Sequence, residues 1–161
     1  MDQVGQEVCK DCLAGKFGDV TGQKSAAAAC KSCPIGWMQE NLGRADCTEC
    51  ATGSYQSAVG KAYCLPCVPG KHQDVTKQES CKDCVANKYT DQTDQATCKN
   101  CDNGQISGVG SASCSKCAAG KAGTTSCADC VAGMFRVGGS GDGTTCDSCP
   151  TGYYQPEKGQ G

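Results

Sequence analysis

The sequence predicts a small disulfide-rich protein, with tandem short β-hairpin repeats forming an elongated rod or solenoid, no conventional hydrophobic core and little or no helix. The chain has 18 cysteines in 161 residues, a density typical of disulfide scaffolds. Leu, Ile, Val and Phe together make up only about a tenth of it, too little for an ordinary core. The cysteines also recur at a nearly constant spacing, so one small unit is repeated along the chain.

All the cysteines occur in C-x-x-C pairs, which define the repeat. The pairs begin at residues 9, 30, 47, 64, 81, 98, 114, 127 and 146. Four consecutive periods are 17 residues long and the others range from 13 to 21, while the spacing within a pair never changes. Loops on a fixed frame vary in this way. We therefore expect a lead-in (1–8), tandem repeats of about 17 residues (9–149) and the start of a truncated further repeat (150–161).

The third residue after the second cysteine is Gly in eight repeats and Asn in the other. These two residue types adopt positive φ most readily, so the pattern predicts a tight turn with a left-handed residue in every repeat. The predicted turn residues are Gly15, Gly36, Gly53, Gly70, Asn87, Gly104, Gly120, Gly133 and Gly152. A second, less strict turn is expected four residues before the next cysteine, at Gly43, Gly60, Lys77, Asp94, Gly110, Gly123 and Asp142.

Two residues after the first turn the chain has a mostly apolar or aromatic position, which we call the slot. We expect the slot residue to pack on a neighbouring disulfide. The slot residues are Phe17, Met38, Tyr55, His72, Tyr89, Ile106, Phe135 and Tyr154, with Ala122 in the seventh repeat. Two turns in each short loop and no 3.6-residue period indicate two short extended pieces, a minimal hairpin. So small a unit is expected to lean on the next one.

The nine C-x-x-C pairs fit a disulfide framework with either of two connectivities. In one, whole pairs join whole pairs, and because nine is odd one pair is left over. In the other, the second cysteine of each pair joins the first of the next pair and only Cys9 and Cys149 are left over, so the count favours this ladder although spacing alone does not prove it. The pairs in the ladder are Cys12–Cys30, Cys33–Cys47, Cys50–Cys64, Cys67–Cys81, Cys84–Cys98, Cys101–Cys114, Cys117–Cys127 and Cys130–Cys146.

Zinc and redox chemistry are the competing interpretations of the cysteine pairs. Two C-x-x-C pairs separated by 13 residues come near the spacing of a zinc site with four cysteine ligands, so a zinc-binding array is kept as an alternative. The odd number of pairs and the absence of linkers between modules count against it. A thioredoxin-like site needs one such motif at a helix N-terminus beside a βαβ pattern, which this sequence does not have.

The sequence contains no recognisable catalytic constellation. There is no Ser-His-Asp set, paired-carboxylate site or phosphate loop, and the single histidine, His72, stands in a slot that Tyr or Phe fills elsewhere. We therefore predict no enzyme activity, no catalytic or metal site and no cofactor. Lys and Arg are spread singly at a net charge of −2, which argues against nucleic acid as a partner. No apolar run approaches the length of a membrane span.

Two segments carry a resemblance to a known family. Cys33-Pro-Ile-Gly-Trp and Cys149-Pro-Thr-Gly-Tyr-Tyr resemble the C-P-x-G-x-[YF] opening of ephrin-receptor-like cysteine-rich repeats, which is shared by tumour necrosis factor receptor modules and growth-factor-receptor-type repeats. The resemblance implies that the cysteine of C-P-x-G pairs with the first cysteine of the next pair, as in the ladder. The seventh repeat departs most, with its short loop and Ala122. As a long array, the chain is similar to surface and matrix proteins of single-celled eukaryotes.

These observations predict an extracellular or cell-surface structural or adhesive segment within a larger surface, matrix or filament-forming protein. The expected partners are other protein chains, including copies of this one. A receptor ectodomain that binds a protein ligand is the alternative from another class. The N-terminus has no apolar h-region of a signal peptide, so we expect the chain to be a fragment. No N-x-[ST] sequon occurs, and Thr124, Thr125, Thr144 and Thr145 are candidates for O-glycans.

Overall fold

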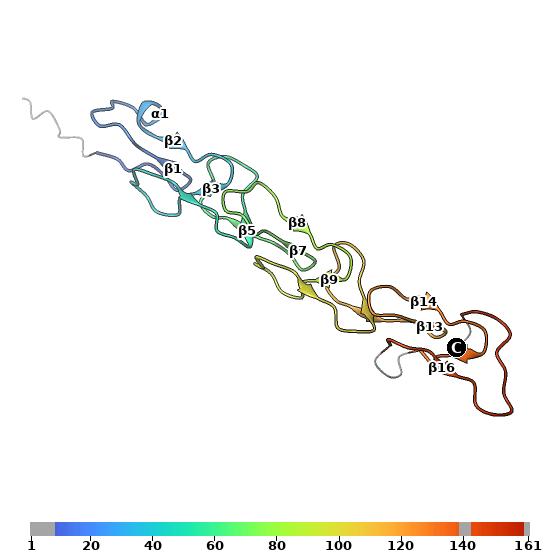
Figure 1. The fold of residues 1–161 in the computed structure, drawn as a ribbon. Helices are drawn as coiled ribbons and strands as arrows, with labels where there is room; N and C mark the ends of the chain where they lie inside the picture. The colour runs from blue at the N-terminus through green and yellow to red at the C-terminus, as the bar shows by residue number, and fades with distance from the viewer. Residues whose placement is uncertain (1–8, 139–142, 160–161) are drawn as a thin grey trace, which may run out of the picture. The chain divides into compact units, whose positions relative to one another are not determined.

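The computed structural model describes residues 9–138 and 143–159. Within them, strands of two residues form two-stranded antiparallel sheets, each from strands that follow one another in the chain (Figure 1). The pairs are β1 (Lys16–Phe17) with β2 (Lys31–Ser32), β3 (Trp37–Met38) with β4 (Thr48–Glu49), β5 (Ser54–Tyr55) with β6 (Leu65–Pro66), β7 (Lys71–His72) with β8 (Lys82–Asp83), β9 (Lys88–Tyr89) with β10 (Lys99–Asn100), β11 (Gln105–Ile106) with β12 (Ser115–Lys116), β13 (Lys121–Ala122) with β14 (Ala128–Asp129), and β15 (Met134–Phe135) with β16 (Asp147–Ser148).

Each hairpin is built from two features of the repeat. Its first strand follows the turn and ends in the slot residue, and its second strand consists of the two residues between the cysteines of the next C-x-x-C pair. In the third repeat Tyr55 pairs with Leu65 and Ser54 pairs with Pro66. The C-x-x-C segment is therefore the closing strand of one hairpin. The predicted class, disulfide-rich tandem hairpins with little helix, is confirmed.

The turn residues have left-handed backbone conformations. All nine predicted turn residues have positive φ, from 63° at Asn87 to 90° at Gly152. At the second turn, Lys77 and Asp94 also have positive φ, at 63° and 62°, although neither is glycine. Asp142 lies outside the described residues. The left-handed region is costly for residues with a Cβ. Hydrogen bonds to the preceding loop accompany it at both residues, since the N–H of Lys77 donates to Cys50 and the N–H of Asp94 donates to Cys67.

One helical turn interrupts the hairpin pattern. α1 (Ala26–Ala29) lies in the Ala-rich insertion of the first repeat, which agrees with the high helix propensity of alanine. Ser25 caps it, because the Ser25 hydroxyl accepts a hydrogen bond from the N–H of Ala28 at 3.3 Å. The insertion is thus absorbed as a local turn of helix and leaves the hairpin β1–β2 in place.

Disulfides occupy the place of a hydrophobic core. The structure contains Cys12–Cys30, Cys33–Cys47, Cys50–Cys64, Cys84–Cys98, Cys101–Cys114, Cys117–Cys127 and Cys130–Cys146. Cys67 and Cys81 are disulfide-bonded as well, which gives a ladder of eight consecutive disulfides with the connectivity that the sequence favours. The second cysteine of most pairs is buried, and Ala122 is the one other buried apolar residue of the described chain. Disulfide cysteines therefore make up nearly all of the fully buried hydrophobic residues of the described chain.

The chain divides into two compact units. The first comprises Met1–Pro66 and Gln73–Cys81 and contains the hairpins from β1 to β6. The second comprises Cys67–His72 and Lys82–Gly161 and contains the hairpins from β7 to β16. Among the residues that the structure describes, no helix is long and apolar enough to cross a membrane.

Candidate functional site: the joints between loops

We number the disulfide-closed loops in chain order: loop 1 (12–30), loop 2 (33–47), loop 3 (50–64), loop 4 (67–81), loop 5 (84–98), loop 6 (101–114), loop 7 (117–127) and loop 8 (130–146). The set of contacts between one loop and the next is called a joint. The joints recur along the chain with the period of the repeat, so they are the candidate functional feature of the array.

The joints are made of backbone hydrogen bonds to the first turn. The N–H of Gly36 in loop 2 donates to the carbonyl of Gln56 in loop 3 at 2.8 Å, and the carbonyl of Gly36 accepts from the N–H of Cys50 at 2.9 Å. Gly120 repeats this with Arg136 at 2.8 Å and Cys130 at 2.7 Å. A turn residue is thus held on both sides by the chain that follows it.

The second turn makes the return contact to the preceding loop. The N–H of Gly60 donates to the carbonyl of Cys33 at 2.8 Å, and the N–H of Gly110 donates to the carbonyl of Cys84 at 2.8 Å. Lys77 makes the same bond to Cys50 at 3.0 Å, which is the contact that accompanies its positive φ. These buried cysteines are therefore covered by the backbone of a later loop.

A buried glutamine holds the loops of the regular repeats from inside. Gln56 is only 2% exposed, its Nε2 donates to the carbonyl of Tyr63 at 2.8 Å, and its Oε1 accepts from the N–H of Ala58 at 3.1 Å. Gln39 and Gln73 are also buried and make the same pair of bonds. Sequence reasoning missed all three, although their spacing of 17 residues is visible in the sequence.

Other residue types at that position, six after the second cysteine, reach back to the preceding loop. The Thr90 hydroxyl accepts from the N–H of Gly70 at 2.8 Å and donates to the carbonyl of Lys71 at 3.3 Å. Arg136, 2% exposed, donates from Nη1 to the carbonyls of Cys117 at 2.9 Å and Lys121 at 3.0 Å. No buried side-chain nitrogen or oxygen of the described chain lacks a partner, so hydrogen bonds offset the cost of burying these polar groups.

The first turn also approaches the loop two repeats further on. A Cβ placed on Gly36 would lie 2.2 Å from the carbonyl oxygen of Lys77, and one placed on Gly70 would lie 2.1 Å from that of Gly110. Glycine is needed here for space as well as for φ.

Asn87 is the exception among the turn residues, and loop 7 accounts for it. The Asn87 Nδ2 donates to the carbonyl of Thr125 in loop 7 at 2.6 Å. The cysteines that close loop 7 are separated by 10 residues, against 14 in loop 5. The shortened loop lies two repeats after Asn87, so it leaves room for a side chain that the regular repeat does not have.

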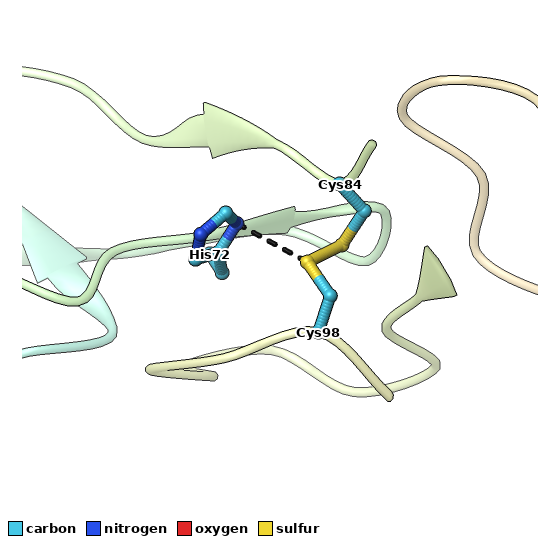
Figure 2. Close-up of side chains that lie close together, drawn as sticks. All are labelled: His72, Cys84 and Cys98. Carbon is cyan, nitrogen blue, oxygen red and sulfur yellow. Dashed lines mark hydrogen bonds between the residues drawn. A yellow bond between two sulfur atoms is a disulfide. The ribbon is translucent and has the colours of Figure 1, made fainter. Parts of the chain in front are cut away.

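His72 lies beside a disulfide of the next loop. Its Nδ1 is 3.1 Å from Sγ of Cys98, which is bonded to Cys84 (Figure 2). The three side chains bring ligand-type atoms within 4.8 Å of one another. Zinc binds the thiolate form of cysteine, and in this disulfide the sulfurs are not thiolates. Sixteen cysteines are disulfide-bonded in the same way, so in this oxidised state an array of four-cysteine zinc sites has no ligands.

Most slot residues are half-buried. This holds for Phe17, Met38, Tyr55, His72, Tyr89, Ile106 and Phe135. Tyr154 differs from the packed position that the pattern predicts, since it is 85% exposed. In the described residues no strand pairs with its segment and Cys149 is not in a disulfide, so Tyr154 has no following joint to pack against.

Exposed lysine–aspartate pairs lie along the hairpins. The Lys99 amino group donates to Asp91 at 2.8 Å, which lowers the pKa of Asp91 and raises the pKa of Lys99. The Lys31 amino group likewise lowers the pKa of Asp19. A lowered carboxyl pKa contributes stability above the ordinary aspartate pKa, and this is lost as the pH falls through the folded-state value. Because these groups are solvent-exposed, their contribution is small.

Comparison with known proteins agrees with the resemblance seen in the sequence. Residues 40–77 match the family model described as "Tyrosine-protein kinase ephrin type A/B receptor-like". No match was found among the curated proteins. Together with the disulfide ladder, the family match fits a cysteine-rich repeat array.

The match and the ladder also define the class of protein in coarse terms. The matched family is a receptor-like cysteine-rich module and is not an enzyme family. Disulfides at this density persist in oxidising surroundings, so they and the receptor-like match indicate an extracellular domain. Such a module is associated with protein partners.

Proposed function

We propose that the array is a structural or adhesive segment of a larger surface, matrix or filament-forming protein. The observation that carries this proposal is the joint: the same backbone bonds recur from loop to loop, and a disulfide closes each loop beside them. Force along such a chain passes through the disulfides and the C-x-x-C segments that link them, and the hydrogen bonds of the joints hold successive loops against one another. The proposed partners are other protein chains, including copies of this one.

Single-molecule extension tests the mechanical part of the proposal. A closed loop cannot lengthen, so in oxidising buffer we expect stretching to release only the segments outside the disulfides. After reduction, a loop such as Cys50–Cys64, with a separation of 14 residues, should release about 40 Å of chain. The shorter loop closed by Cys117 and Cys127, with a separation of 10, should release about 30 Å.

The matched control is the double substitution Cys50→Ser and Cys64→Ser. In the absence of reductant, this variant should show one additional increase in length, from the opening of loop 3. The other loops should stay closed by their disulfides. A chain that reaches its full contour length at low force in oxidising buffer would contradict the mechanical role.

The receptor ectodomain is the second candidate, because the matched module is receptor-like. A receptor of this kind needs an exposed apolar patch confined to a few repeats. The residue after the second cysteine is exposed and apolar in repeats throughout the chain instead, as Leu13, Val68, Val85 and Val131 show. The position is Asp102 in one repeat, but the exposed apolar residues are spread along the chain and are not confined to a few neighbouring repeats, which favours the structural role.

Sedimentation of the oxidised chain over a range of concentrations separates the two candidates. Concentration-dependent association that is lost when Val68 and Val85 are changed to Ser supports self-assembly through the repeated positions. A chain that stays monomeric and has one ligand patch opposes the structural role.

A further inference from the structure

We propose that Cys84–Cys98 is a thiol-exchange site, the link of the ladder that reacts preferentially with a low-molecular-weight thiolate, and that His72 stabilises the thiolate of Cys98. This goes beyond the structural role, because it gives one repeat a chemistry that its siblings lack. The evidence is the position of the single histidine of the chain against this one disulfide (Figure 2).

Only His72 can donate a hydrogen bond in this contact. The Cys98 sulfur belongs to a disulfide and carries no proton, so it can only accept, and the tautomer of His72 with a proton on Nδ1 donates to it at 3.1 Å. The same ring N–H would face the sulfur after the disulfide opens. A thiolate is stabilised by a neighbouring imidazole N–H, and most strongly by imidazolium, which favours the reduced form of the link.

Two aspartates near this link in the sequence are paired with lysines. Lys82 is the cross-strand partner of His72 in the β7–β8 sheet, and Lys99 follows Cys98 directly. The nearby carboxylates bind lysines, since Asp83 accepts from Lys71 and Asp91 accepts from Lys99. Each of these two aspartates is therefore neutralised by its own lysine, so neither opposes a negative charge on Cys98.

Accessibility sets the order of the bond changes. Cys98 is half-buried whereas Cys84 is 0% exposed, so a solvent thiolate attacks Sγ of Cys98. The new sulfur–sulfur bond forms as Cys84 leaves as a thiolate, which takes a proton from water. A second small thiolate then attacks the small-molecule sulfur of the mixed disulfide, and Cys98 leaves as a thiolate beside His72. Two small thiols are oxidised to their disulfide while one protein disulfide is reduced.

The test is limited reduction of the full oxidised chain with reduced glutathione, quenched by alkylation and mapped by mass spectrometry. Cys84 and Cys98 should be alkylated before any other pair, about tenfold faster than the neighbouring link Cys101–Cys114. His72→Tyr, which places the residue of a sibling slot there, should slow this link to the rate of its neighbour. If the link reduces no faster than its neighbour in the unaltered chain, the proposal is overturned.

The direction of the His72→Tyr effect distinguishes chemistry from packing. A substitution that merely loosened the joint would expose the disulfide and speed its reduction, so an unchanged or faster rate overturns the proposal. Tyr89 occupies the slot one loop later, which makes Cys101–Cys114 the equivalent link. Tyr89→His should speed reduction of that link more than Tyr89→Asn, which loosens the slot without an imidazole. Equal effects of the two substitutions also count against the role of the imidazole.

Discussion

At the scale of the residue, a buried glutamine makes the side-chain hydrogen bonds that stabilise a regular loop. Gln39, Gln56 and Gln73 each bond a carbonyl seven residues later and an N–H two residues later, so a single side chain connects the middle of its loop to the residue before the closing cysteine. In a chain with so few large apolar residues, these hydrogen bonds stabilise the loop interior where an ordinary protein would have a packed apolar side chain. The cost of burying the glutamine is offset because both of its polar atoms have partners.

Replacing Gln56 by Ala should loosen loop 3 strongly. The substitution leaves the N–H of Ala58 and the carbonyl of Tyr63 without partners, which costs about 1–3 kcal/mol. We expect amide hydrogen exchange at Ala58 to rise by about tenfold or more in the oxidised protein. The control is Gln92→Ala at an exposed position, which should change little. Equal effects of the two substitutions would show that the hydrogen bonds of Gln56 do not stabilise the loop.

At the scale of the element, the hairpin is defined by its neighbours as much as by its own sequence. Strands of two residues are too short to be stable alone. The turn of a hairpin is bonded by the following loop, and its glycine lies against the loop two repeats later, as Gly36 does against Lys77. A hairpin of this array is therefore stable only within the stack.

Gly36→Ala tests the close approach, and Gly22→Ala is its control. Both glycines have positive φ, 79° and 73°, but only Gly36 has another loop where the Cβ would lie. Gly22→Ala should cost about 1–2 kcal/mol for the left-handed backbone alone. Gly36→Ala should cost clearly more in the free energy of unfolding, measured by denaturant titration of the oxidised protein. Similar losses at both sites would mean that loops 2 and 4 do not touch as described.

At the scale of the whole molecule, the ladder makes stability a local property. The joints connect a loop to its immediate neighbours, and the close approaches of the first-turn glycines reach the loop two repeats away. The disulfides of the described chain connect only consecutive C-x-x-C pairs. Stability in such a stack is close to a sum of repeat and neighbour contributions. A substitution that destabilises one repeat should therefore destabilise only that repeat and the loops in contact with it.

Removing one disulfide tests this locality. The double substitution Cys33→Ser and Cys47→Ser opens a loop of 14-residue separation, which should cost about 3 kcal/mol in the chain-entropy model. Hydrogen exchange should speed up in loop 2 and in loops 1, 3 and 4, which contact it, and stay unchanged in loop 8. A loss of protection in loop 8 as large as in loop 2 would show global cooperativity in place of local joints.

The sequence by itself determined the features that lie within one repeat. A C-x-x-C spacing and a Gly or Asn three residues later restrict φ and chain direction locally, so the turns at Gly53 and Asn87, the hairpins and the class of disulfide scaffold could be predicted. Only the tertiary structure showed the interactions between repeats, such as the contact of Asn87 with Thr125 and that of His72 with Cys98. It also showed that Lys77 has a left-handed backbone conformation. These depend on how closely successive loops stack, which no local pattern encodes.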